Sequence, residues 1–320
     1  MIASTRLVHA DVLKGLAIIG IVLQHCGFDI VTANLHVPVF FIISGYFFKE
    51  ESMGVIVKKR TRQLLIPYLW FVLLFFLVKW VFNYLDAHDV LISLKTTISS
   101  VKLFKLNVIL HKSIWFLPVL FFITVLYRLV RYVKSEWVIL GMVLLLFLVG
   151  YLQDNYWHLR LIYLTGSVLS GLIYFHFGYM FRKHEKALDK RNWMWMVVIL
   201  AIWCVSTHVL EPEHSYKNNV YPIYLPLLVI PTVIALFLLL KKLGEVKVAK
   251  PLVLAGLFSM GILGYHALCN IVIDELQITA MVGTNVMPYI RLTVILLLAP
   301  IMISISNRFI PCTIGKKTKK

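Results

Sequence analysis

The chain has 320 residues, of which 60% are hydrophobic and only 15% are charged. Soluble domains are nearer half apolar and a quarter charged, so both values indicate a membrane protein. A membrane span needs about 20 apolar residues, so this length allows about ten spans and leaves no room for a sizeable soluble domain. The composition therefore excludes a cytosolic enzyme, a disordered chain and a receptor with a single anchor.

Apolar runs separated by charged clusters follow one another along the whole chain, and the second and fifth runs are short for a bilayer. Ten spans would place both termini on one side of the membrane. We predict an all-α integral membrane protein, a bundle of about ten transmembrane helices spanning residues 1–310, followed by a basic cytoplasmic tail at 311–320. The ten runs are 12–30, 36–48, 64–83, 113–132, 137–152, 160–181, 193–210, 221–240, 251–274 and 287–306.

The net charge of +17 follows this topology. Of the 32 lysines and arginines, 24 fall on one side of the alternating scheme, and 8 fall on the other side or within the membrane. Basic residues gather in cytoplasmic loops, so both termini are predicted to be cytoplasmic in a multi-pass protein of the cell (inner or plasma) membrane. The charge is explained by topology, and we expect the lipid bilayer as a partner and no nucleic acid.

Two further features of the sequence bear on its surroundings. The start of the chain lacks a short apolar core followed by a cleavage site, so no removable signal peptide is expected. The four cysteines are scattered without a C-x-x-C pair, which supports neither a disulfide framework nor a zinc site, and no metal is expected. They are Cys26, Cys204, Cys269 and Cys312.

The longest external segment, 84–112, has apolar residues at helical spacing, among them Leu91 and Ile98, with lysines on the remaining faces. This pattern predicts an amphipathic helix that lies on the outer leaflet or caps a cavity. A surface helix without a role in chemistry is the alternative.

The first span carries ionisable residues, which are costly in a membrane and are therefore functional candidates. Lys14 and His25 are eleven residues apart, which places them on one face of a helix and roughly 16 Å apart along its axis. His25 suits proton transfer because imidazole titrates near neutrality. Lys14 could instead extend to the interface, and Asp11 is expected to pair with it.

The second span begins a few residues later, so His36 is expected on the outer side, close to His25. His36 has either a catalytic or acceptor-binding role or an interfacial position satisfied by water. Pro38 permits a break in the helix, and Ser44 and Gly45 permit close helix contact. Ordinary small-residue packing is the favoured interpretation of these two residues.

Three later features complete the candidates. A basic cluster at Lys58, Lys59, Arg60 and Arg62 marks the cytoplasmic face, and it also suits recognition of an anionic ligand. Trp115 opens the fourth span, where it could be an interfacial aromatic residue. Late in the chain, Tyr265, His266 and Asn270 form a polar patch in the ninth span. Arg291 lies a few residues into the tenth span, where it either pairs in the interior or extends to the interface.

These residues carry a family resemblance. Lys14 and His25 with ten residues between them, and the run HVPVFFIISGYF from His36 to Phe47, resemble the first two spans of the membrane acyltransferase 3 family. The basic cluster before LLIPY, the WFLP that begins at Trp115 and the pair Tyr265-His266 are similar to later motifs of that family. The pattern is closest to the fucose 4-O-acetylase-like branch. Lys14 stands where many members have arginine, which weakens bidentate phosphate binding there.

The resemblance implies transfer of an acyl group, usually acetyl, from a coenzyme A thioester to a carbohydrate hydroxyl. His25 and His36 are then the catalytic candidates, with His25 acting as a general base or as a nucleophile. Acetyl-CoA is the expected donor substrate, and a glycan or lipid-linked sugar is the expected acceptor. The donor would be bound by Lys14, Lys58, Lys59, Arg60 and Arg62, and the structural or pocket-lining candidates are Asp11, Ser44, Gly45, Trp115, Tyr265, His266 and Asn270.

A transporter or flippase of a glycan-related substrate is the alternative from another class. Ten spans with polar residues at mid-depth and a helix break near Pro38 would suit substrate translocation. The sequence shows no paired repeats and few acidic residues inside spans to couple ions, which favours the enzyme.

Overall fold

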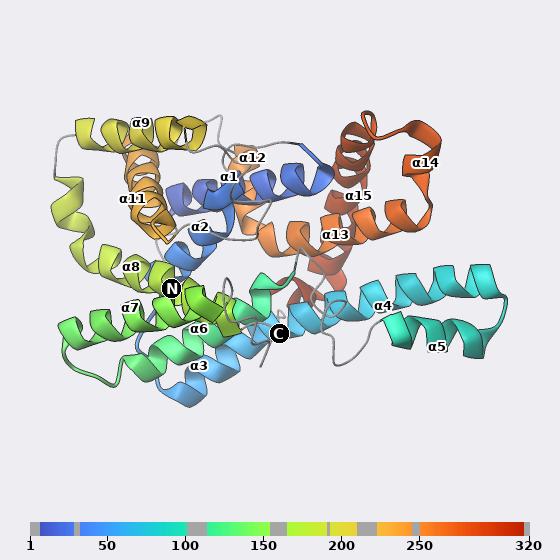
Figure 1. Cartoon of the computed structure of the whole chain (residues 1–320), viewed down its shortest axis with the longest axis horizontal. Helices are drawn as coiled ribbons and strands as arrows, with labels where there is room; N and C mark the ends of the chain where they lie inside the picture. The colour runs from blue at the N-terminus through green and yellow to red at the C-terminus, as the bar shows by residue number, and fades with distance from the viewer. Residues whose placement is uncertain are drawn as a thin grey trace. The chain divides into compact units, whose positions relative to one another are not determined.

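The computed structural model describes residues 7–28, 33–100, 114–153, 165–190, 193–209, 223–244 and 250–316. Within these ranges the chain is helical and has no strand (Figure 1). The helices are α1 Val8–Cys26, α2 Ala33–Tyr46, α3 Met53–Arg60, α4 Ile66–Ala87, α5 Val90–Ser100, α6 Phe116–Val130, α7 Glu136–Leu152, α8 Thr165–Asp189, α9 Met194–Val209, α11 Leu225–Leu243, α12 Lys250–Leu257, α13 Ser259–Glu275, α14 Ile278–Val282 and α15 Met287–Phe309, with a π-helical stretch η1 at Thr61–Leu65 and a 3₁₀ turn η4 at Pro311–Ile314.

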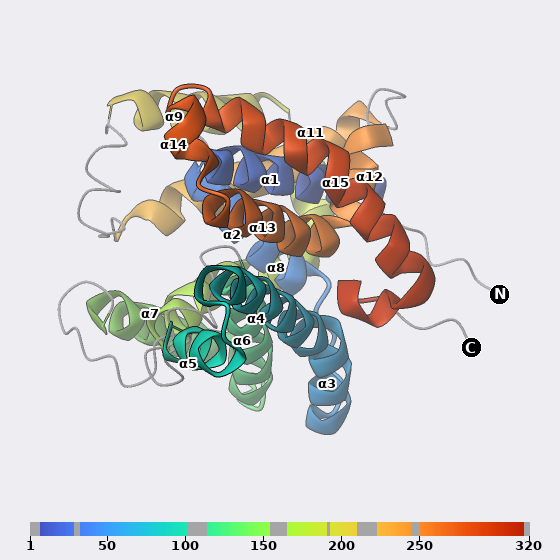
Figure 2. The ribbon, with the colours of Figure 1, turned by 90° about the vertical axis from the view of Figure 1, so that its right-hand side faces the viewer.

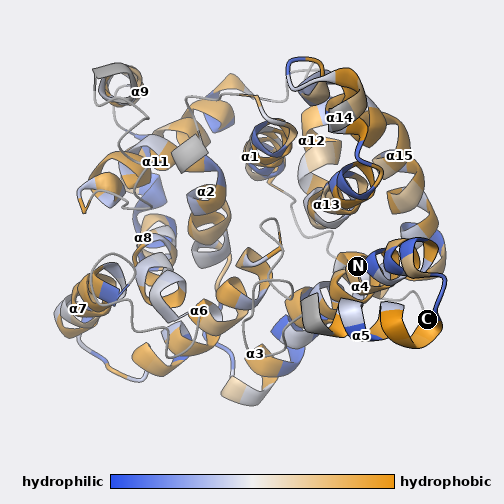
Figure 3. Cartoon of the chain, turned by 45° about the vertical axis from the view of Figure 1, so that its right-hand side comes forward, coloured by the Kyte–Doolittle hydropathy of each residue, from blue (hydrophilic) through white to orange (hydrophobic). Residues whose placement is uncertain are grey.

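Four helical segments are long and apolar enough to cross a membrane, and a fifth qualifies if α12 and α13 are joined across a break. They are Val8–Cys26, Met53–Ala87, Leu225–Leu243 and Met287–Phe309. Helices suit such sequences because a backbone in lipid must satisfy its hydrogen bonds internally. Figure 3 shows hydrophobic residues along most of the helices. The chain is therefore an all-helical membrane protein.

Each of the ten predicted apolar runs overlaps one or two helices, but several helices are short. Helix α2 has 14 residues, about 21 Å at 1.5 Å per residue, against a hydrocarbon core of about 30 Å. Helix α8 has 25 residues, but its last two turns are charged. The count of ten spans and the side of the termini therefore stay predictions.

Two predicted details of the spans differ from the structure. The ninth run, 251–274, is not one helix, because it is broken at Phe258 between α12 and α13. Pro38 does not break the second span, since α2 continues through it. Pro38 is the sixth residue of α2, so it removes one backbone hydrogen bond of the helix without ending it.

The described chain divides into two compact units. The first contains most of α1, with α2, α6 to α9, α11 and α12. The second contains the end of α1, with α4, α5 and α13 to α15. In residues, the first unit is Met1–Ile21, Ile30–Val57 and Val119–Leu257, and the second unit is Val22–Asp29, Lys58–Pro118 and Phe258–Lys320.

Close helix contacts in the first unit depend on glycines. A Cβ on Gly45 of α2 would collide with the backbone carbonyl of Phe175 on α8, and a Cβ on Gly178 of α8 would collide with that of Ile42. Gly15 of α1 and Gly256 of α12 are equally close to the facing backbones. Small residues allow this approach of helix backbones, which is typical of packing in membranes.

In the second unit α4 packs on α13, and α13 packs on α15 (Figure 2). The ring of Phe71 on α4 contacts Tyr265 with a centroid distance of 5.2 Å, and it leaves no room for a Cβ on Gly264. Lys79 on α4 pairs with Glu275 on α13 at 3.1 Å. The two contacts lie eight and ten residues further along their respective helices, so α4 and α13 run in the same direction.

The predicted amphipathic helix in 84–112 is present as α5, and residues 101–112 lie outside the described part of the chain. Helix α5 folds back on α4 with its polar side inward. Ser93 and Thr97 are fully buried and accept hydrogen bonds from Trp80 (3.2 Å) and Asn83 (2.9 Å). The apolar side, including Leu91, faces outward.

Candidate active site

The most direct link between distant functional candidates joins the ends of α1 and α13 within the second unit. Nδ1 of His25 lies 2.9 Å from Nε2 of His266, 241 residues away in the sequence. The two rings are nearly parallel (11°) with centroids 5.2 Å apart, as a hydrogen bond in the ring planes requires. His266 is fully buried, whereas His25 is half-buried. The side-chain hydrogen-bond partner of His25 is thus a histidine on α13.

The hydrogen bonds of His266 fix the tautomers of both rings. Nδ1 of His266 lies 2.8 Å from the carbonyl oxygen of Ile262, which can only accept, so this nitrogen carries the proton. In a neutral ring Nε2 of His266 then accepts, and Nδ1 of His25 must donate to it. The lone pair of His25 therefore lies on Nε2, which is the arrangement that a general base or nucleophile needs.

Asn270, one turn after His266, extends this cluster. Its side-chain nitrogen donates to the backbone carbonyl of His25 at 3.4 Å, a long hydrogen bond. His266 and Asn270, four residues apart on one face of α13, are therefore both turned toward α1. Tyr265 points to α15 instead, where its hydroxyl is hydrogen-bonded to Ser306. Tyr265 and Ser306 hold α13 against α15 and leave His266 facing His25.

Two ion pairs lie at the C-terminal end of α13. Arg291 of α15 pairs with Asp274 at 2.5 Å, but the Asp274 side chain is 59% exposed, so both alternatives for Arg291 stay predictions. Lys79 pairs with Glu275, the last residue of α13. Both pairs lie beyond Asn270 along α13, so the helix carries the polar cluster first and the ion pairs at its end.

In the first unit Lys14 forms the predicted pair with Asp11, at 2.7 Å. Asp11 is buried, and the side chain of Lys14 is 25% exposed. Helix α12 packs closely against this turn, because Gly15 faces the backbone carbonyl of Leu252 and Gly256 faces that of Asp11. Lys14 and His25 both lie on the uninterrupted helix α1, so the helical spacing that predicts their common face applies to them.

The predicted donor-binding cluster lies at the end of α3 and in η1. Lys58, Lys59 and Arg62 are exposed, and Arg60 is half-buried beside Gln63. The π-helical stretch at Thr61–Leu65 was not predicted; such stretches frequently occur at functional sites. Nine residues of helix separate Arg62 from Phe71 and thirteen separate Lys58 from it, so the cluster lies about 13 to 20 Å along the axis from the level of Tyr265 and His266.

Four other candidates have contacts of their own within their units. His36 is buried, and its ring packs against Gly20 of α1 in the first unit. Gly45 makes the close contact with α8, next to half-buried Ser44. Trp115 is half-buried in the turn before α6. The proximity of His36 to His25 and the roles of these residues stay predictions.

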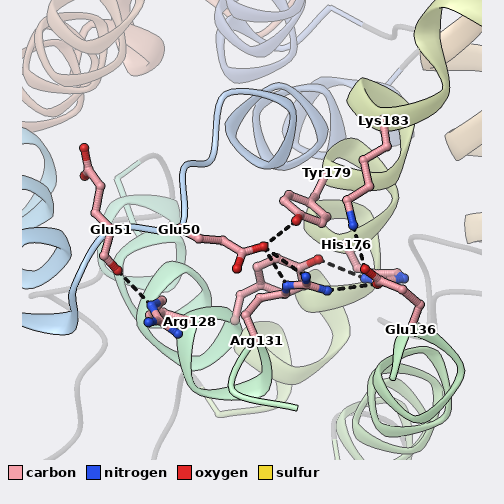
Figure 4. Close-up of polar contacts among 9 residues, drawn as sticks. Glu50, Glu51, Arg128, Arg131, Glu136, His176, Tyr179 and Lys183 are labelled. Carbon is pink, nitrogen blue, oxygen red and sulfur yellow. Dashed lines mark hydrogen bonds and ion pairs between the residues drawn. The ribbon is translucent and has the colours of Figure 1, made fainter. Parts of the chain in front are cut away.

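A second polar cluster, which the sequence reasoning did not single out, joins the α2–α3 loop, the turn after α6 and α8 (Figure 4). Arg131 pairs with Glu50 (3.0 Å) and Glu136 (2.9 Å), and Lys183 pairs with Glu136 (2.6 Å). Burial by itself raises the pKa of Glu50, but the hydrogen bond from Tyr179 and the charge of Arg131 outweigh it and hold that pKa below its usual range.

The basic side chains Arg131 and Lys183 of this second cluster are paired with carboxylates, so the cluster suits a structural role in which it holds these segments together. Arg128 also donates to the carbonyl of Glu51, at 2.8 Å. The one sequence signal for this second cluster was the recurrence of basic residues in loops assigned to the same side of the membrane. Among the described residues no group of three histidine, cysteine, aspartate or glutamate side chains could hold a metal ion.

The fold defines a helical membrane protein in which the imidazoles of His25 and His266 are hydrogen-bonded to each other. The family model described as an acyltransferase domain matches residues 8–306, nearly the whole chain. The chain therefore belongs to the acyltransferase 3 family, and the membership covers His25, His266 and the basic cluster. No curated protein and no solved structure matches it.

Proposed function

We propose that this membrane acyltransferase is an O-acetyltransferase. It would move an acetyl group from acetyl-CoA to a hydroxyl of a cell-surface glycan or its lipid-linked precursor, as the fucose 4-O-acetylase-like branch suggests. The observation that carries the proposal is the hydrogen-bonded chain from Ile262 through His266 to His25, within a chain of acyltransferase membership. It leaves a basic nitrogen on His25, as acyl transfer to a hydroxyl requires.

The donor side of the proposal rests on charge and spacing. Coenzyme A carries phosphates and is cytoplasmic. The basic cluster of Lys58, Lys59, Arg60 and Arg62 lies on α3 and η1, about 13 to 20 Å along the helix from the level of His266. Lys14 lies roughly 16 Å from His25 along α1. A long thioester arm would bridge either interval and bring its carbonyl carbon to His25.

The chemistry follows from the tautomer of His25. As a general base, Nε2 takes the proton of the acceptor hydroxyl while the oxygen attacks the thioester carbon and the thiolate leaves. As a nucleophile, Nε2 attacks the same carbon, and an acyl-imidazole then reacts with the hydroxyl. In both routes the positive charge on His25 is stabilised by its Nδ1–H bond to neutral His266.

The proposed surroundings are the cell membrane with ten spans and cytoplasmic termini, so that the basic cluster faces the coenzyme. The first experiment incubates purified protein in nanodiscs with radiolabelled acetyl-CoA and follows thioester consumption and protein-bound label. We expect wild-type protein to consume thioester and His25→Ala to lose activity by about 10²- to 10⁴-fold, the usual contribution of a general base.

The control is His184→Ala, which removes an exposed histidine on the charged end of α8. That variant is expected to retain wild-type turnover. Full activity of His25→Ala would overturn the assigned role. Absence of both turnover and coenzyme A binding in folded wild-type protein would instead favour transport of a glycan-related substrate.

A further inference from the structure

Asn270 has an unusual environment for a polar side chain. It is 6% exposed, and among the described residues its side-chain oxygen Oδ1 is buried without a hydrogen-bond partner. Buried polar atoms are nearly always paired, so such an atom requires an explanation. The same side chain lies next to the reactive pair, because its nitrogen donates to the backbone carbonyl of His25.

The orientation of the amide determines what is missing. The carbonyl of His25 can only accept, so the nitrogen of Asn270 must face it and the oxygen must face the unpartnered direction. A rotated amide would place two acceptors against each other. The vacant interaction therefore calls for a hydrogen-bond donor, such as a hydroxyl or an amide N–H.

The hydroxyl that reacts does not supply this donor. It has one proton, which His25 Nε2 removes, so Asn270 needs a second donor on a substrate. The position of Asn270 indicates which substrate. It lies one turn beyond His266, toward the end of α13 that carries the Asp274 and Glu275 ion pairs, and away from the direction in which the coenzyme arm would arrive in the proposed topology.

We infer that Asn270 determines acceptor specificity by accepting a hydrogen bond from a second hydroxyl of the acceptor, close to the one that is acetylated. The acceptor would then present neighbouring hydroxyls, as sugars do, and a substrate with a lone hydroxyl would be discriminated against. A site built to bond a hydroxyl rejects analogues that lack it, because its own polar group is then left unpaired. This inference rests on the proposed function.

The test separates the two substrates kinetically. Membranes of the native host lacking the gene supply the acceptor, and purified protein is added with radiolabelled acetyl-CoA. We compare wild type with Asn270→Leu, which has nearly the same size but no acceptor oxygen. The concentration of acceptor membranes that gives half the maximal rate is expected to rise at least tenfold, while the KM for acetyl-CoA is unchanged.

Two controls address a purely structural effect. Cys269→Ala alters the neighbouring buried position and is expected to leave both concentration dependences unchanged. The thermal unfolding temperature of Asn270→Leu without substrate is expected to match or exceed that of wild type, because the variant loses only one long hydrogen bond and removes an unpaired acceptor.

Each outcome is decisive. An unchanged acceptor dependence in folded Asn270→Leu overturns the inference and leaves the enzyme class intact. A raised KM for acetyl-CoA alone overturns it in favour of an amide of the thioester arm as the donor. Absence of His25-dependent transfer by wild type overturns the proposed function and the inference with it.

Discussion

At the scale of single residues, the proposed chemistry depends on the hydrogen bond between the imidazoles of His25 and His266. In the familiar triad a carboxylate orients the catalytic histidine and stabilises its charged form. Here His266 takes that position, and its own proton is fixed by the carbonyl of Ile262. In the proposed mechanism a neutral His266 would orient the ring of His25 and stabilise its charged form without introducing a buried negative charge, which would be costly in a membrane.

Substitution of His266 should separate orientation from binding. His266→Ala is expected to lower the rate of acetyl transfer by about 10- to 100-fold with little change in the KM for acetyl-CoA, because a hydrogen bond to a charged group contributes about 1.5–3 kcal/mol. His266→Gln retains an acceptor oxygen and most of the volume, so it should recover part of the loss. Steady-state assays in nanodiscs measure both values.

The Gln variant also serves as the control for packing, since His266 is fully buried. Equal rates for the Ala and Gln variants would show that volume, and not the hydrogen bond to His25, is what matters. A wild-type rate in His266→Ala would remove His266 from the mechanism.

At the scale of elements, the α4–α5 hairpin has its polar residues inside and its apolar residues outside. Ser93 and Thr97 bond to α4, while Leu91 is 76% exposed and Ile92 is 56% exposed. In water, each large apolar side chain left exposed would lack the stabilisation of about 1.5–3 kcal/mol that its burial contributes. The outward face of α5 therefore suits contact with lipid.

Spin labels test this orientation. A nitroxide at Leu91→Cys is expected to be accessible to oxygen, which concentrates in the bilayer, and protected from a water-soluble nickel chelate. A label at Asp89→Cys, in the exposed turn before α5, should show the opposite preference. Protection of Leu91→Cys from both reagents would indicate a protein partner, and nickel accessibility would place α5 in water.

At the scale of the whole molecule, ion pairs join loops that the predicted topology places on the same side of the membrane. Loops assigned to the cytoplasmic side by their basic residues are joined through Glu50, Arg131, Glu136 and Lys183. Lys241, at the end of α11, likewise pairs with Glu185 of α8. Ends that bond to one another must lie on the same side of a bilayer.

Cysteine labelling measures the sidedness directly. In a background with the native cysteines replaced by serine, Ser52→Cys and Lys134→Cys should react with an impermeant maleimide only after the membrane is opened to the cytoplasmic side. Asp86→Cys and Asn285→Cys should react from outside in intact cells. All four positions are exposed. Labelling of both pairs from the same side would contradict the ten-span scheme.

The sequence by itself determined the membrane class, the helices and the common face of Lys14 and His25. These follow from apolar runs and helical spacing, which are local properties of the chain. It could not place the break at Phe258, because a bend within an apolar run depends on what each half packs against. Nor could it predict η1, since a π-helical stretch leaves the apolar pattern nearly unchanged.

Only the tertiary structure decided which polar residues meet. His25 and His266 are 241 residues apart, and no spacing rule links them. The contact arises because α13 packs between α4 and α15, with Phe71 against Tyr265 and the Tyr265 hydroxyl bonded to Ser306, and this packing turns His266 toward α1. The tautomer of His25 and the unpaired oxygen of Asn270 follow from that packing, because they depend on atoms that only the folded chain brings within hydrogen-bond distance.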